Sequence, residues 1–140
     1  MSTLVVHTDG GARGNPGPAA AGVVILLNGQ LILEAGKYLG VQTNNEAEYQ
    51  AVLHALTLLP DVLKKHEVNQ IEWRLDSMLV VQQLSRQWKI KESRLAVFAQ
   101  QIWQQLSALS APSTFKYVPR AENAAADAMV NKILDLEAKK

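Results

Sequence analysis

The chain has 140 residues, of which 48% are hydrophobic and 19% are charged, a balance typical of a globular protein and not of a disordered one. The absence of cysteine excludes a disulfide framework, a thiol nucleophile and a cysteine-ligated zinc site, and it leads us to expect a cytoplasmic protein. The formal net charge of +1 is low for a dedicated nucleic-acid-binding protein, so a polyanionic substrate would require clustered basic residues or help from a metal ion.

The hydrophobic pattern predicts a single domain over residues 1–140, without an export signal or a membrane-spanning segment. In chain order it first predicts a strand at 4–8, a hairpin at 22–36 around Asn28 and Gly29, and a helix that begins after Thr43 and ends at Pro60. It then predicts a strand at 70–76, helices at 77–88 and 92–109, a strand at 113–118 and a helix at 122–140. This order predicts an α/β fold with a mixed sheet covered by helices.

Two acidic residues are expected at the carboxyl ends of strands. Asp9 follows the run at 4–8 and opens the stretch "DGGARGNPGP", and Asp76 ends the strand at 70–76. If these strands are parallel neighbours, both carboxylates emerge at one edge of the sheet, where ligands of α/β folds collect. Asp76 with Ser77 could instead cap the next helix. The stretch after Asp9 therefore allows either a tight turn or a loop thin enough for a ligand to approach.

Glu46 and Glu48 lie near the start of the helix that follows Thr43. Side chains two positions apart on a helix point in different directions, so these two cannot both hold one ion. The sequence "TNNE" fits a capping box, in which the carboxylate of Glu46 returns to the backbone N–H of Thr43. This structural role for Glu46 leaves Glu48 as the candidate for a site.

A fourth acidic candidate is Asp127, in the alanine-rich first turns of the last helix, although an acidic residue is also favoured there by the helix dipole alone. Clustered carboxylates repel one another and need a cation, and a ligand set made only of oxygen favours Mg²⁺ or Mn²⁺. Two such ions about 4 Å apart can activate a water and stabilise the leaving oxygen of a phosphodiester. Four carboxylates from four elements could therefore form a two-metal site.

The chain resembles type 1 ribonuclease H, because four stretches match that family's signature blocks in order: "TDGGARGNPGPAAAG", "TNNEAEYQAVLHAL", "LDSMLVVQQL" and "VPRAENAAADAMVN". The resemblance implies a ribonuclease H-like fold, with a mixed five-stranded sheet of order 3-2-1-4-5 flanked by helices. It also implies two-metal cleavage of the RNA strand of RNA/DNA hybrids with Mg²⁺, for which Mn²⁺ can substitute, leaving 5′-phosphate and 3′-hydroxyl ends. By position, it assigns catalysis and metal binding to Asp9, Glu48, Asp76 and Asp127.

The resemblance also implies substrate contacts at six positions: Gly10, Gly11, Asn15, Thr43, Asn44 and Asn45. The three asparagines match residues that sense 2′-hydroxyl groups, which distinguish RNA from DNA in a shallow minor groove. The threonine matches a contact to a DNA phosphate, and the two glycines belong to a turn that lets the hybrid backbone come close. These asparagines favour RNA as the cleaved strand over the alternative of a related nuclease that acts on DNA.

The chain lacks the long basic insertion that many family members carry between their second and third helices. Only "SRQWKIKESR" joins these helices here, which is similar to the branch without this protrusion. Trp88, among the basic residues of this segment, could hold the DNA strand through charge and an apolar ring, or it could belong to the core.

Two further departures concern the active site. The family's mobile histidine before the last carboxylate is missing, and Arg120 in "YVPRAEN" is either its substitute or an ordinary surface residue. Met78 replaces a glutamine that often contacts a base. His7 lies on the same strand face as Asp9, but a histidine inside a sheet is more often a core residue than a ligand.

A second class of function is a non-catalytic domain that binds hybrids or a protein partner. The full set of carboxylates argues against it, because uncompensated acidic repulsion is costly unless a cation is present. We therefore expect a monomeric, metal-dependent endoribonuclease whose partner is an RNA/DNA hybrid.

Overall fold

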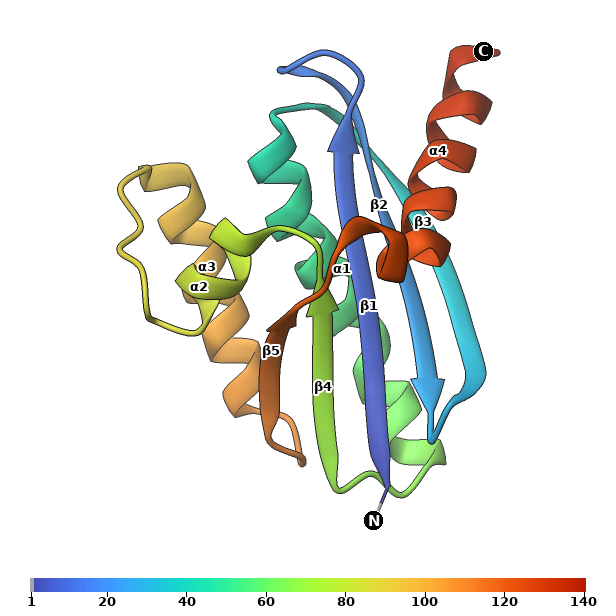
Figure 1. The fold of residues 1–140 in the computed structure, drawn as a ribbon, viewed down its shortest axis with the longest axis vertical. Coiled ribbons are helices and arrows are strands. Elements are labelled where there is room, and N and C mark those ends of the chain that lie inside the picture. The colour runs from blue at the N-terminus through green and yellow to red at the C-terminus, as the bar shows by residue number, and fades with distance from the viewer. Residues whose placement is uncertain (1) are drawn as a thin grey trace.

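A computed structural model describes residues 2–140, which form a five-stranded sheet with helices on both faces (Figure 1). The strands are β1 (Thr3–Ala12), β2 (Gly17–Leu27), β3 (Gln30–Gln42), β4 (Gln70–Leu75) and β5 (Ser113–Tyr117). The helices are α1 (Asn44–Lys65), α2 (Met78–Leu84), α3 (Ser93–Ser107), the short 3-10 helix η1 (Arg120–Asn123) and α4 (Ala124–Ala138). None of the described helices is both long and apolar enough to cross a membrane.

The sheet has the order β3-β2-β1-β4-β5, which confirms the fold class and the strand order implied by the resemblance. The strands β1, β2 and β3 are antiparallel neighbours, whereas β4 and β5 run parallel to β1. Asn28 and Gly29 join β2 to β3 with φ angles of 49° and 83°, the left-handed backbone that a tight two-residue hairpin requires. The predicted hairpin is therefore confirmed, although both of its strands are longer than expected.

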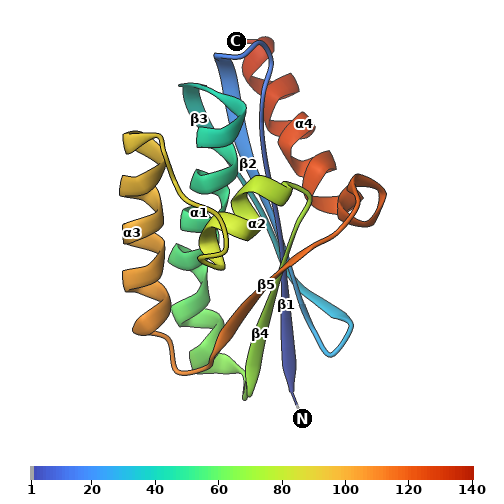
Figure 2. The ribbon, with the colours of Figure 1, turned by 60° about the vertical axis from the view of Figure 1, so that its left-hand side comes forward.

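Helices α1, α2 and α3 cover one face of the sheet, and α4 covers part of the other (Figure 2). The main core lies between the sheet and α1 and α3, and its largest fully buried side chains include Trp73, Tyr49, Leu4, Ile25 and Ile102. A smaller apolar cluster of Ala20, Val130 and Leu134 lies under α4. The site described below lies between these two helical layers, at the end of the sheet where β4 stops.

Three predicted helix boundaries are wrong. Pro60 does not end its helix, because the buried Leu59 and Val62 continue the apolar stripe and their packing offsets the lost backbone hydrogen bond. The helix predicted at 77–88 ends at Leu84, shortly before Arg86 adopts a left-handed φ of 63°. The last helix begins at Ala124 and not at residue 122, because η1 precedes it.

The capping box at the start of α1 gives a stability prediction. Thr43 Oγ1 accepts the N–H of Glu46 at 3.1 Å, and Glu46 Oε1 accepts the N–H of Thr43 at 2.8 Å. Because Thr43→Ala leaves one of these helix N–H groups without its partner, we expect the free energy of unfolding to fall by about 1 kcal/mol. Urea denaturation measures this, with Thr57→Ala in the exposed middle of α1 as the control. Equal losses in the two variants would contradict the prediction.

Candidate active site

Three carboxylates converge beside the end of β4. Asp9, Glu48 and Asp76 each offer an oxygen within 4.8 Å of the oxygens of the other two. The sequence pattern predicts that Asp76 ends its strand, but β4 stops at Leu75 and Asp76 immediately follows it. Asp9 does not end β1, because the strand continues to Ala12 and Asp9 is paired with Gly22 of β2. The parallel pairing of β1 with β4 reaches only as far as His7, so Asp9 lies where β1 runs past its neighbour.

Glu48 reaches this point because α1 packs unusually close to β1. The N–H of Gly10 donates a hydrogen bond to Glu48 Oε1 at 2.5 Å. A Cβ atom on residue 10 would lie 2.1 Å from the carbonyl oxygen of Ala47, so only glycine allows this approach. The structure therefore gives Gly10 a packing role, because it allows α1, which carries Glu48, to lie close to β1.

The division of roles between Glu46 and Glu48 is as predicted from the capping box. Glu46 bonds to Thr43, and its Oε2 also accepts a hydrogen bond from the guanidinium of Arg94 at 3.0 Å. The N–H of Thr43 and this guanidinium hold the pKa of Glu46 below its ordinary value. Glu46 is thus occupied by the cap, and Glu48 faces the other carboxylates.

Asp127 lies at the rim of the same site. It projects from the first turns of α4 and lines a cavity of about 390 Å³ together with the three converging carboxylates. Asp127 is not a member of the compact cluster, and its Oδ1 lies 3.9 Å from Nη2 of Arg120. The structure therefore brings all four predicted carboxylates to one cavity, three of them with oxygens within 4.8 Å of one another and one at its edge.

The electrostatics of the cluster favour a bound cation. Burial, with repulsion from Asp76 and Asp127, raises the pKa of Asp9 to about 7. Burial and the neighbouring Asp9 also raise the pKa of Glu48 well above its ordinary value. Glu48 Oε2 is buried and has no hydrogen-bond partner among the described residues. An oxygen-only site with an unpartnered buried oxygen fits a hard divalent ion such as Mg²⁺ or Mn²⁺.

The asparagines expected to contact substrate surround the turn between β1 and β2. Asn44 Oδ1 accepts the N–H of Ala12 at 2.9 Å, and the N–H of Asn44 donates to Asn15 Oδ1 at 3.0 Å. These bonds hold the turn against the start of α1. Asn44 and Asn45 are exposed and line the cavity, as does Gly11. Thr43 lies beside Arg94 in a neighbouring hollow.

The basic segment between α2 and α3 contains an exposed tryptophan. The alternative that Trp88 belongs to the core is wrong, because 48% of its surface is exposed. Arg86 is stacked on Trp103, with its guanidinium carbon 3.8 Å from the ring centroid. Trp88 and Lys89 line a hollow separate from the carboxylates. Aromatic and basic groups are thus available on this surface.

Arg120 borders the carboxylate cavity, and Met78 lies two residues after Asp76 in the chain. Arg120 is exposed on η1 and lines the cavity, so it is a surface residue that also borders the site. Met78 begins α2 and is 40% exposed.

Sequence reasoning missed Asn123, the last residue of η1. It is buried, and its side chain contacts the backbone of Thr8, the carboxylate of Asp76 and the ring of His7. Its position before an alanine-rich helix suggests an ordinary cap, so nothing in the local pattern reveals these contacts. His7 is half-buried and hydrogen-bonded, as expected of a core histidine, and burial lowers its pKa.

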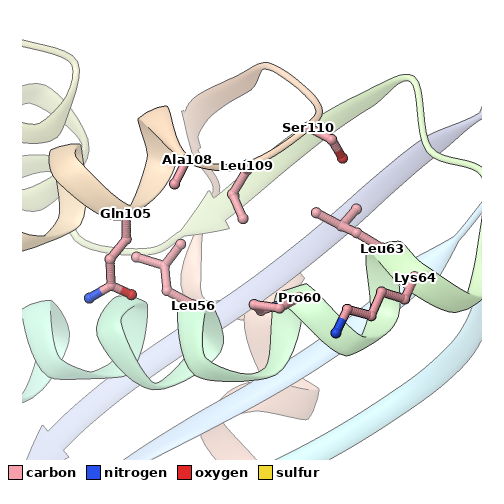
Figure 3. Close-up of a pocket in the computed structure, with 8 residues that line it drawn as sticks. All are labelled: Leu56, Pro60, Leu63, Lys64, Gln105, Ala108, Leu109 and Ser110. Carbon is pink, nitrogen blue, oxygen red and sulfur yellow. The ribbon is translucent and has the colours of Figure 1, made fainter.

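A second cavity, of about 350 Å³, lies between the C-terminal halves of α1 and α3 (Figure 3). Leu56, Pro60, Leu63 and Leu109 form most of its apolar wall, and Lys64 lies at its edge. Among residues 2–140, no acidic side chain lines this cavity, so it lacks the carboxylate oxygens that the first cavity offers to a cation.

Comparisons with known proteins agree with this geometry. The reverse transcriptase-like family matches residues 7–133 of the chain. Ribonuclease HI of Halobacterium salinarum is 39% identical over 92% of this chain and 63% of its own length. A bifunctional protein of Mycobacterium tuberculosis is 35% identical over 96% of this chain but 36% of its own length. The chain thus spans between about one third and two thirds of these curated relatives.

Solved structures extend the likeness to nearly the whole chain. LC11-RNase H1, isolated from compost by a metagenomic approach, has a TM-score of 0.92 and 38% identity, with 99% of each chain covered. A second structure of LC11-RNase H1, in complex with an RNA/DNA hybrid, has a TM-score of 0.87 and 39% identity, and it covers 92% of this chain and 94% of that one. The similarity therefore includes every element that contributes a carboxylate to the site.

Proposed function

Because this chain belongs to the ribonuclease H family, we propose that it is a type 1 enzyme that hydrolyses the RNA strand of RNA/DNA hybrids, leaving 5′-phosphate and 3′-hydroxyl ends. The observation that carries this proposal is the cluster of Asp9, Glu48 and Asp76 within 4.8 Å, with an unpartnered buried oxygen on Glu48. Without a bound ion, three carboxylates this close together would only lower the stability of the fold.

We propose that Asp9, Glu48 and Asp76 hold Mg²⁺, that Mn²⁺ can substitute, and that Asp127 completes the ligand set at the rim. When bound in a pair, such ions lower the pKa of a water and stabilise the leaving 3′-oxygen of a phosphodiester. The protein's part is to fix the carboxylates on β1, α1, β4 and α4 before substrate arrives. Without a histidine in the cavity, we expect the substrate phosphate or solvent to receive the proton of the attacking water.

Asn15, Asn44 and Asn45 are proposed to recognise 2′-hydroxyl groups, and Gly10 and Gly11 to let the hybrid backbone approach. The exposed positions of the asparagines beside the cavity support this assignment. Asn15 and Asn44 also brace the turn, so Asn45 is the position where recognition can be tested with the least effect on structure.

Trp88 and the basic residues around it are proposed to hold the DNA strand, with Thr43 on a DNA phosphate. The exposed ring of Trp88 is available for such a contact, and basic neighbours attract phosphates in a salt-dependent way.

Arg120 cannot relay protons because a guanidinium stays charged. We therefore propose that Arg120, beside Asp127, attracts the substrate phosphate and does not replace the family histidine in proton transfer. The predicted monomeric state and cytoplasmic location stay predictions.

A cleavage assay on an RNA/DNA hybrid with labelled RNA tests the function. We expect cleavage with Mg²⁺ or Mn²⁺, none with EDTA, and none of a DNA duplex. Products should carry 5′-phosphate and 3′-hydroxyl ends. Hybrid binding without cleavage under either ion would favour the non-catalytic domain.

Asn45→Ala tests recognition of the ribose. One hydrogen bond is worth about 1 kcal/mol, so we expect KM for the hybrid to rise about fivefold with kcat little changed. The effect should disappear on a substrate whose contacted ribose is replaced by 2′-deoxyribose. Asn69→Ala, at the opposite end of β4, is the control. An equal rise of KM on both substrates would exclude a contact to the 2′-hydroxyl.

A further inference from the structure

Asn123 connects three elements around the carboxylate cluster. Its side chain lies in the interior, with 1% of the residue's surface exposed. Its Nδ2 donates to the carbonyl of Thr8 at 2.9 Å and to Asp76 Oδ2 at 3.4 Å. Its Oδ1 lies 2.9 Å from Nδ1 of His7. A single amide thus joins β1, the segment after β4 and the start of α4.

The direction of each hydrogen bond follows from the chemistry of the partners. The carbonyl of Thr8 can only accept, so the amide nitrogen must face it, and the same nitrogen then lies within hydrogen-bond distance of Asp76 Oδ2. The amide oxygen of Asn123 then faces His7, whose Nδ1 must carry the proton that completes the bond. His7 therefore fixes the orientation in which Asn123 donates to Asp76.

These contacts restrain Asp9 and Asp76, whose relative positions are not fixed by the pairing of β1 with β4. Asp76 lies beyond the end of β4, and Asp9 lies beyond the last residue pair that joins β1 to β4. Asn123 bridges this gap, because one of its bonds is to the residue before Asp9 and another is to Asp76 itself.

We propose that Asn123 is a positioning residue that sets the separation of Asp9 and Asp76, and that His7 holds its amide in the donating orientation. The inference rests on the proposed function, because it assumes that these carboxylates bind a divalent ion. Groups that orient metal ligands typically change metal affinity about 10- to 100-fold when removed. Asn123 is buried and does not line the cavity, so it should affect the ion and not the affinity for the hybrid.

Binding of Mn²⁺ to the substrate-free protein, followed by the loss of the free-ion electron paramagnetic resonance signal, tests this directly. We expect Asn123→Leu to weaken Mn²⁺ binding about tenfold or more. In cleavage assays, the Mg²⁺ concentration for half-maximal rate should rise by a similar factor, while KM for the hybrid at saturating Mg²⁺ stays within about twofold.

Gln83→Leu is the matched control, because it also removes a buried amide that forms side-chain hydrogen bonds. Gln83 accepts from the hydroxyl of Tyr49 at 2.6 Å and donates to the carbonyl of Lys89 at 3.2 Å, and it touches no carboxylate. We expect this variant to lose stability but to keep the Mn²⁺ affinity of the wild type. Equal weakening of Mn²⁺ binding in both variants, or none in Asn123→Leu, would overturn the proposal.

His7→Phe provides a second test that leaves Asn123 in place, in case Asn123→Leu does not fold. Loss of the histidine donor should weaken Mn²⁺ binding about two- to fivefold, the effect of one neutral hydrogen bond. Unchanged affinity would overturn the role of His7. If the wild type binds Mn²⁺ but cleaves no hybrid, only the proposed function fails. If the wild type binds no Mn²⁺, the proposed function and this inference fail together.

Discussion

Asp9→Asn is expected to lower the rate of hybrid cleavage at saturating Mg²⁺ by on the order of 10³-fold. Metal ions contribute several kcal/mol of charge stabilisation to such reactions, and about 1.4 kcal/mol corresponds to a factor of ten. Asp9 offers an oxygen within 4.8 Å of oxygens of both Glu48 and Asp76, so its charge acts on any ion held there. The substitution keeps the shape of the side chain and removes only the charge.

The same substitution should stabilise the metal-free protein. The pKa of Asp9 is raised from 3.8 to about 7, so the folded state holds this proton more tightly than the unfolded state does. That contribution favours folding at low pH and is lost as the pH rises from about 4 toward 7. Asparagine does not titrate. In EDTA, we therefore expect Asp9→Asn to unfold at a higher temperature than the wild type at pH 8, and at a similar temperature at pH 4.

Thermal unfolding with and without Mg²⁺ separates these two effects. Mg²⁺ should raise the unfolding temperature of the wild type, because it binds only the folded state, and should raise that of Asp9→Asn much less. Asp61→Asn, an exposed change on α1, is the control and should follow the wild type in both assays. Cleavage by Asp9→Asn at the rate of the wild type would exclude Asp9 as a metal ligand.

The parts of the fold that sequence patterns predicted are those that depend on local chemistry. Asn28 and Gly29 predict the hairpin because few other residues accept left-handed backbone. Thr43 and Glu46 form a cap within four residues, and this local signal is enough to separate Glu46 from Glu48. The family resemblance, in contrast, supplied the strand order, and it assigned to one site the four carboxylates that the element ends only suggested.

The features that escaped prediction depend on contacts between distant segments. Pro60 lies within α1 because packing on the sheet outweighs its lost hydrogen bond. The expectation that proline ends a helix considers only neighbouring residues and takes no account of such packing. Asn123 acts on Thr8 and Asp76, which are 115 and 47 residues away in the chain. No periodicity or spacing around Asn123 carries information about partners at that distance.

Gly10→Ala should lower the free energy of unfolding by about 3 kcal/mol, at the upper end of overpacking costs. The added Cβ would lie 2.1 Å from the carbonyl oxygen of Ala47 and 2.5 Å from the backbone nitrogen of Glu48. Because both contacts are with backbone, no side-chain rotation can relieve them. Urea denaturation gives the loss, and Gly11→Ala is the matched control, since its Cβ meets only Val130 Cγ1 at an ordinary 3.6 Å.

The clash at residue 10 also connects stability to the site. Relief of the clash requires α1 to withdraw from β1, and this movement carries Glu48 away from Asp9 and lengthens its bond to the N–H of residue 10. Gly10→Ala should therefore weaken Mn²⁺ binding even under conditions where the variant is fully folded, whereas Gly11→Ala should not. A folded Gly10→Ala protein with the Mn²⁺ affinity of the wild type would mean that the close approach of α1 serves packing alone. Weaker Mn²⁺ binding by a folded Gly10→Ala protein would mean that the metal site requires glycine at this position, because only glycine lets α1 bring Glu48 close to Asp9.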